Sequence, residues 1–289
     1  MKERSLVAFT LLSQMAVGAF WVLGALHVWA TRRAGMAAAG ALTDKALLAI
    51  GPVMILGMLF SFFHLGTPTN AWRAFANLRS SWLSREVLFA VLFTGLSGLL
   101  AGLRWFRVGT FAARNLIAWA AALLGLALIC SMANAYRLRT VPAWNTWATP
   151  VSFFVTTFLL GGLTVGGMLA GNPGVPPGLW RLSLQWIALG AILLLGVELV
   201  IVPLWVVGLM AGRGAAVRAA AKITQEHRAI FWLRLALAVA GVAVAGLTLS
   251  PWGEGAQTGI ATALAFGLVL ASEVLGRLLF FEARVRHGV

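Results

Sequence analysis

The stretch FSFFHLGTPTNAWRAFANLRSSWLSREVLFA, residues 60–90, contains the end of one apolar run and the start of the next. The first run ends at His64, and the second opens at Ser84-Arg85-Glu86 after a more polar loop. A histidine and a carboxylate therefore lie at adjacent ends of two consecutive segments of membrane length. Ionisable groups at such depths are costly and usually have a function. This stretch is the first place to look for chemistry.

The composition is that of an integral membrane protein. Hydrophobic residues make up 61% of the sequence and charged residues only 10%, with a mean hydropathy of +0.91. The apolar residues occur in long blocks, as expected when each spanning helix needs about 20 of them. The net charge of +14 comes from basic residues scattered singly between these blocks, which does not suggest a nucleic-acid surface.

Eight segments are long and apolar enough to span a bilayer, and all should be helices, because lipid does not tolerate unpaired backbone. We predict an all-α bundle of eight transmembrane helices. No fixed-period repeat or low-complexity linker divides the sequence, so residues 1–289 form one membrane domain. The predicted spans are residues 5–30, 46–65, 86–104, 115–135, 149–171, 181–211, 229–249 and 257–281. Gly98-xxx-Gly102 and Gly162-xxx-Gly166 suggest close helix contacts.

Eight spans place both termini on one side of the membrane. Thirteen basic residues lie near helix ends on that face and seven on the opposite face. The positive-inside rule then predicts cytoplasmic termini. A basic face could also bind an acidic partner protein, which would inflate the count.

The sequence offers few ligands for a redox centre of its own. It has one cysteine, Cys130, which excludes a CxxC site or an iron–sulfur cluster held by this protein alone. Antiparallel neighbours put His27 and His64 on opposite faces, and His227 lies at the surface, so no pair of histidines suits a haem. We predict neither a haem nor a metal site.

Buried charges gather in the C-terminal half. Glu273 and Arg277 are four residues apart on one predicted helix, so they share a face and can pair. Arg234 and Glu198, on two other spans, could extend them into a buried network. A lock that fixes helix packing is favoured over a proton path, because no run of acids or histidines crosses the membrane.

His64 and Glu86 differ because neither has an opposite charge fixed beside it in sequence. Ser84 is the expected N-cap, which places Glu86 in the first helical turn, where the helix dipole favours a carboxylate. Imidazole and carboxylate could each accept one of the two protons that a quinol loses on oxidation. The alternative is a capping carboxylate beside an interfacial histidine.

These residues also carry a family resemblance. The stretches His64-Leu65-Gly66-Thr67-Pro68 and Leu83-Ser84-Arg85-Glu86 resemble the membrane anchor subunit of dimethyl sulfoxide reductase and its relatives. Further along, the similar motifs are Tyr136, Thr140-Val141-Pro142-Ala143-Trp144, Pro150, Phe153-Phe154-Val155-Thr156, Glu273-Val274-Leu275-Gly276-Arg277 and Phe280-Phe281. Each motif is short, and their order along the sequence is the stronger signal. Phe281 departs from the tyrosine expected there.

The resemblance implies a haem-free anchor in a bacterial cytoplasmic membrane that oxidises menaquinol in anaerobic respiration. Electrons would pass to a four-cluster iron–sulfur subunit and on to a molybdopterin catalytic subunit. His64 and Glu86 would bind the quinol, with Ser84 and Tyr136 behind them. The iron–sulfur partner should dock on the face of the loop between the second and third spans, where Arg73, Arg79, Arg137 and Arg139 could contact it.

Two other interpretations remain open. A polysulfide-reductase-type anchor would also have eight helices and no haem. A secondary transporter would predict inverted repeats and helices broken at the midplane, and the sequence shows neither.

Overall fold

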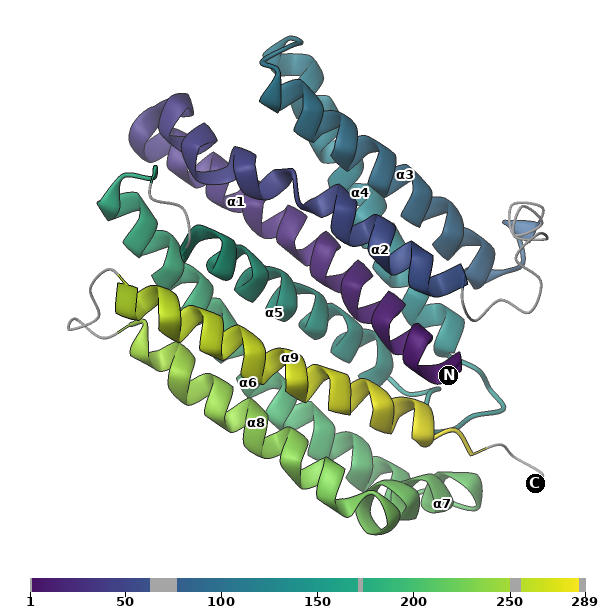
Figure 1. Ribbon diagram of the computed structural model, residues 1–289. Helices are drawn as coiled ribbons and strands as arrows, with labels where there is room; N and C mark the ends of the chain where they lie inside the picture. Colours follow the sequence, from purple (N-terminus) through teal and green to yellow (C-terminus); the bar gives the residue numbers. More distant parts are fainter. Residues whose placement is uncertain (1, 63–76, 171–173, 250–255, 286–289) are drawn as a thin grey trace.

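The computed structural model describes residues 2–62, 77–170, 174–249 and 256–285, which form helices and turns with no strand (Figure 1). In sequence order the elements are α1 (Lys2–Leu47), α2 (Ile50–Phe62), α3 (Trp82–Trp105), α4 (Phe111–Tyr136), α5 (Ala148–Ala170), α6 (Pro177–Met210), α7 (Ala215–Ala221), the π-helical turn η2 (Lys222–Glu226), α8 (Arg228–Leu247) and α9 (Ala256–Glu282). The prediction of an all-α membrane bundle agrees with this architecture.

The N-terminal 60 residues form a helical hairpin rather than one rod. Gly35 interrupts α1 with φ 84° and ψ 169°, a conformation that glycine adopts without strain. Beyond it the backbone returns along itself: Thr43 Oγ1 lies 3.0 Å from His27 Nδ1. Further down, Gly57 packs against Leu12. Residues 31–45 were predicted to lie between two spans. They do contain the reversal at Gly35, but they are otherwise helical, and the helix continues to Leu47.

The described residues contain seven helices long and apolar enough to cross a membrane, with Arg4–Ser61 counted once. The predicted number of eight is not established by this count, because the hairpin at Gly35 lies inside that first stretch. The other predicted spans agree with the observed helices to within a few residues. The short helices α7 and η2 were not predicted.

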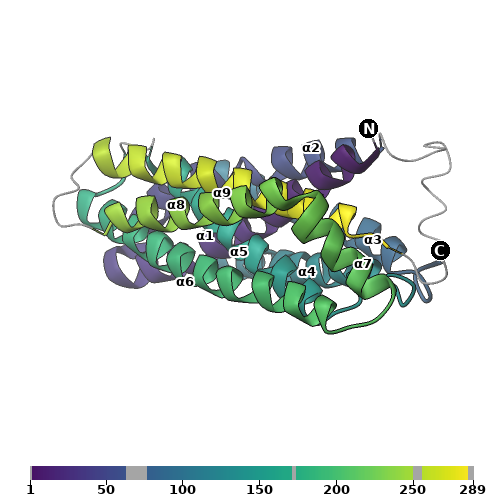
Figure 2. The ribbon, with the colours of Figure 1, turned by 90° about the horizontal axis from the view of Figure 1, so that it is seen from below.

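The helices lie side by side along one direction, with α3 and α4 at one flank, α6 and α8 at the other, and α1 and α5 between them (Figures 1 and 2). The start of α1, the start of α3 and the ends of α4 and α9 lie at one end of the bundle (Figure 1). We call this the terminal end. The Gly35 turn, the end of α3 and the start of α4 lie at the opposite end.

Central packing depends on α1 against α5. A side chain at Gly18 or Gly161 would overlap the backbone of the other helix, so these two glycines permit close contact. Of the predicted glycine pairs, Gly166 packs closely against Thr262 of α9. The prediction for Gly98 and Gly102 was wrong, because a Cβ at either would have nothing within 4 Å.

Candidate functional site

The start of α3 positions Glu86. Ser81 is the N-cap, and its side chain accepts a hydrogen bond from the Ser84 amide at 3.2 Å. The prediction of Ser84 as N-cap was therefore wrong, and Glu86 lies in the second turn rather than the first. Ser84 itself is buried in the first turn. The dipole at the helix start consequently acts less strongly on Glu86 than predicted.

Glu86 is a buried carboxylate without a compensating cation in the part of the protein that the structure describes. It is 3% exposed, and among the described residues no donor or cation pairs with it. Its neighbour Arg85 points to the preceding loop, donating hydrogen bonds of 2.8 Å to the carbonyls of Leu78 and Arg79. The Arg85 guanidinium also lies 4.3 Å from the Trp82 ring centre. Arg85 therefore fixes the loop to α3 and does not compensate Glu86.

His64 lies outside the described residues, so the structure gives no geometry for the predicted pair. The same applies to Arg73. The described part of the terminal end contains a cavity of about 480 Å³ between the start of α3 and the end of α4, which we call the rim cavity. It is lined by Ser80, Ser81, Trp82, Leu83, Asn134, Ala135, Arg137, Leu138, Arg139 and Asn145.

Tyr136, the only tyrosine of the sequence, is the centre of an aromatic cluster. Its ring centre lies 5.7 Å from those of Trp144, Phe153 and Phe280, and 5.5 Å from that of Phe281. Trp144 donates a 2.6 Å hydrogen bond to the Phe280 carbonyl, which joins the loop before α5 to α9. The phenylalanine at position 281 thus packs on Tyr136 within the core.

Tyr136 also lies between two groups of charges. Both Glu86 and Arg277 are within electrostatic range of its hydroxyl. The Arg277 guanidinium carbon lies 3.9 Å from the Phe153 ring centre, a cation–π contact at a buried site. Sequence reasoning placed Tyr136 behind the quinol site, and in the structure its hydroxyl is near enough to both Glu86 and Arg277 to interact with each electrostatically.

The buried charges themselves come from three helices and contact two more. Arg234 of α8 forms an ion pair with Glu198 of α6. Glu273 of α9 accepts a 2.7 Å hydrogen bond from the Thr156 hydroxyl of α5. Arg277, also of α9, donates a 2.7 Å hydrogen bond to Gln14 Oε1 of α1. The predicted direct pairing of Glu273 with Arg277 is not among the ion pairs of the described residues.

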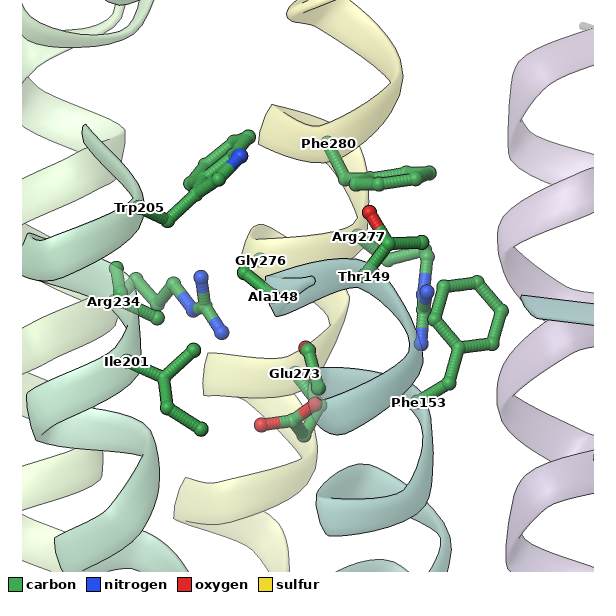
Figure 3. Close-up of a pocket in the computed structure, with 12 residues that line it drawn as sticks. Ala148, Thr149, Phe153, Ile201, Trp205, Arg234, Glu273, Gly276, Arg277 and Phe280 are labelled. Atoms are coloured by element: carbon green, nitrogen blue, oxygen red, sulfur yellow. The ribbon is translucent and has the colours of Figure 1, made fainter. Parts of the chain in front are cut away.

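Figure 3 shows the Arg234 guanidinium pointing from α8 toward Gly276 and Glu273 of α9. These groups surround a cavity of about 40 Å³. A side chain at Gly276 would overlap the guanidinium of Arg234. With two arginines and two glutamates, the cluster carries no net charge when all four are ionised. We refer to Glu198, Arg234, Glu273 and Arg277 as the buried charge cluster.

Sequence reasoning missed two members of this region. Gln14 bridges Arg277 to α5, donating a 2.7 Å hydrogen bond to the Phe153 carbonyl. A lone glutamine within the apolar run of residues 6–30 was the available signal. Gly276 was noted only as part of a family motif. Its role, leaving space for the Arg234 guanidinium of α8, depends on helix packing that the sequence does not show.

The fold is that of a multi-pass helical membrane protein. The chain belongs to the DMSO reductase anchor subunit (DmsC) family, whose model matches residues 1–282. Its resemblance to this family, inferred above from short motifs, is confirmed.

Comparison with individual proteins supports the same family membership. The sequence is 27% identical to the C chain of anaerobic dimethyl sulfoxide reductase from Escherichia coli (strain K12), over 99% of its own length and 96% of that protein. It is 26% identical to the anaerobic dimethyl sulfoxide reductase chain YnfH of the same organism over the same shares. A third relative, the C subunit of sulfite dehydrogenase from Allochromatium vinosum, is 35% identical over 48% of this sequence and 47% of its own. The protein is therefore an anchor subunit of the DMSO reductase type.

Proposed function

We propose that this anchor oxidises menaquinol and passes the electrons to an iron–sulfur partner subunit. The observation that carries the proposal is Glu86, a buried carboxylate with no cationic partner among the described residues. Such a group is costly unless it exchanges protons or binds a ligand. A quinol headgroup offers a hydroxyl that can donate to it.

The chemistry needs two proton acceptors at one headgroup. Oxidation of a quinol to a quinone releases two electrons and two protons. In the proposal Glu86 accepts one proton and His64 the other, while both electrons pass to the partner. Ser84, buried on the same helix, and Tyr136 would shape the environment of the carboxylate. Neither a haem nor a cluster in this protein is required if the partner's nearest iron–sulfur cluster lies close to the quinol.

The partner subunit is proposed to dock at the terminal end. Arg79, Arg137 and Arg139 are exposed there, and the last two line the rim cavity. An acidic partner surface would match these arginines. Beyond that partner, a molybdopterin subunit would reduce the terminal acceptor.

We further propose that the protein crosses a bacterial cytoplasmic membrane eight times, with cytoplasmic termini. The contacts of Thr43 with His27 and of Gly57 with Leu12 support two antiparallel passes within Arg4–Ser61. A cysteine introduced at Ala34 should then react with an impermeant maleimide from the side opposite one introduced at Arg4. Labelling of both from the same side would contradict eight passes.

A second candidate is the reverse reaction, in which the anchor delivers electrons to a quinone. It is favoured by the similarity to a subunit of a sulfite dehydrogenase, since a dehydrogenase removes electrons from its substrate. The same two residues would then donate protons to the quinone instead of accepting them. Assays in both directions distinguish the two candidates.

The test uses the complete complex with His64→Ala or Glu86→Gln. Both variants should lower quinol-linked turnover by at least about 100-fold, the scale of a lost acid–base group. Activity with an artificial donor that reaches the partner directly should be unchanged. Glu226→Gln, which alters an exposed carboxylate in η2, serves as the matched control.

Unchanged quinol-linked turnover in both variants would reject the site. An optical spectrum of the purified anchor with haem bands would reject the haem-free mechanism.

A further inference from the structure

A large cavity in the described part of the molecule lies at the end of the bundle opposite the terminal end. It measures about 710 Å³ and is bounded by the hairpin of α1, the end of α3 and the start of α4. Glu86 and Arg104 are at the two ends of α3, about 27 Å apart along the helix axis. This cavity is therefore separate from the proposed quinol site. Its walls include Met36, Leu100, Trp105, Phe111, Ala118 and six ionisable side chains.

Three of the ionisable side chains, those of His27, Asp44 and Arg104, are joined by an ion pair and a hydrogen bond. Asp44 forms a 2.7 Å ion pair with Arg104. Arg104 also donates hydrogen bonds to His27 Nδ1 at 2.6 Å and to Thr43 Oγ1 at 3.3 Å. Asp44 is the only acidic residue that lines the cavity, as far as the structure describes the protein. Its charge is already balanced by Arg104.

Lys45 and Arg107, which are exposed, and Arg114, which is half-buried, therefore remain on the cavity wall as positive charges without an acidic partner among the described residues. Within the described ranges none of the three forms an ion pair. Arg107 and Arg114 both line this cavity, and both lie within electrostatic range of Asp44. Three like charges around one cavity repel one another, and a bound anion would relieve that repulsion.

Arg107 occupies a backbone position that favours glycine. Its φ is 57°, and it is the one non-glycine residue with positive φ among those described. The amide of Val108 bonds to the Leu103 carbonyl at 3.0 Å and that of Arg107 to the Arg104 carbonyl at 3.3 Å. This is the helix-ending motif in which glycine is usual. An arginine here strains the backbone, and its side chain lines the cavity.

Arg114 also lies where its charge is locally unfavourable. Thr110 is the N-cap of α4, so Arg114 is near the helix start, at the positive end of the helix dipole. A carboxylate would be preferred at this position. Two arginines at the wall of one cavity thus oppose the local preferences of their own backbone positions.

We propose that this cavity is a binding site for a phosphate group, held by Arg107, Arg114 and Lys45. Guanidinium groups match phosphate oxygens with paired hydrogen bonds, and the helix dipole at the start of α4 adds to the attraction. Both an anionic phospholipid and free phosphate carry this chemistry. The apolar wall of Leu100, Trp105 and Phe111 would accommodate the acyl chains of a lipid.

The experiment measures binding to the purified full-length protein in detergent by native mass spectrometry. The probes are phosphatidylglycerol, phosphatidylcholine and inorganic phosphate. Arg107→Gln/Arg114→Gln should weaken binding of phosphatidylglycerol at least about tenfold, because two charge-assisted contacts are lost. The matched control is Arg32→Gln/Arg33→Gln, which removes two exposed arginines near the same end that do not line the cavity. The control should bind as the unchanged protein does.

The variant Arg107→Gly tests whether weaker lipid binding results from the lost cation or from a folding defect. Glycine removes the cation and suits the backbone at this position, so its thermal midpoint in phosphatidylcholine should be equal or higher. Its binding of phosphatidylglycerol should nevertheless fall. Binding of inorganic phosphate alone, lost in the double variant, would support the phosphate site with free phosphate as its source. Equal losses in the control, or no loss in the double variant, would overturn the proposal.

Discussion

Glu86 and Glu198 are buried to the same degree, at 3% and 4% exposure, yet their surroundings differ. Glu198 is paired with Arg234, and the cluster around it contains one arginine for each glutamate. Glu86 has Tyr136 within electrostatic range and no compensating cation among the described residues. Glu198 therefore belongs to a group of mutually compensating charges, whereas Glu86 has no such group among the described residues.

The difference indicates two uses of a buried carboxylate. Within a neutral cluster, opposite charges compensate one another, and removing one leaves its partner buried and unpaired. A carboxylate without a partner adds little to folding, so its presence is better explained by a ligand or a proton. The buried charge cluster should therefore respond to mutation mainly in stability, and Glu86 mainly in turnover.

The strongest test of the comparison is Arg234→Met. This change leaves Glu198 unpaired within the bundle and should destabilise the fold by about 3–5 kcal/mol. Thermal unfolding of the purified protein in lipid nanodiscs measures the loss. Adding Glu198→Leu should restore most of the stability, because the unpaired charge is then removed as well. A loss below about 1 kcal/mol in Arg234→Met would show that the cluster is not a lock.

Gly276→Ala tests the same cluster by adding a methyl group beside it instead of removing a charge. The added methyl would overlap the Arg234 guanidinium, which could move away only by disturbing its ion pair with Glu198, so we expect a loss of about 1–3 kcal/mol. Gly98→Ala is the matched control, because a Cβ at Gly98 would have nothing within 4 Å. The control should leave the unfolding midpoint unchanged or raise it. Equal effects in both variants would mean that general helix propensity, and not the arginine, explains Gly276.

Glu86→Gln should change stability by no more than about 1 kcal/mol, since an amide of the same shape replaces a carboxylate without a described partner. The unfolding midpoint is compared with that of Arg234→Met under identical conditions. Quinol-linked turnover is expected to fall in the first variant and to persist in the folded fraction of the second. Loss of stability in Glu86→Gln as large as in Arg234→Met would remove the distinction between the two regions.

Sequence predicted the helices well where apolar length alone decides them. The prediction of 115–135 compares with Phe111–Tyr136 in α4, and 149–171 with Ala148–Ala170 in α5. It failed where polar residues extend a helix past the apolar run. Arg32 and Arg33 suggested a loop, but the helix continues and reverses only at Gly35.

The site was harder to predict, because its contacts join residues distant in sequence. Glu198, Arg234, Glu273 and Arg277 were recognised as buried charges, yet the partners that they choose depend on how the helices pack. The i, i+4 spacing suggested that Glu273 pairs with Arg277, whereas Arg277 reaches Gln14 of α1 instead. Ser81 was missed as the N-cap because Ser84 offers the same hydroxyl closer to Glu86.

Tyr136→Phe has the smallest expected effect and tests whether the two regions are linked. The variant keeps the ring contacts with Trp144, Phe153, Phe280 and Phe281, so stability should change little. If the hydroxyl only shapes the surroundings of Glu86, quinol-linked turnover in the complex should fall less than about tenfold, which corresponds to about 1.4 kcal/mol. A loss as large as that of Glu86→Gln would contradict a supporting role. The hydroxyl would then act together with the carboxylate, and the boundary between the two regions would lie beyond Tyr136, at Arg277.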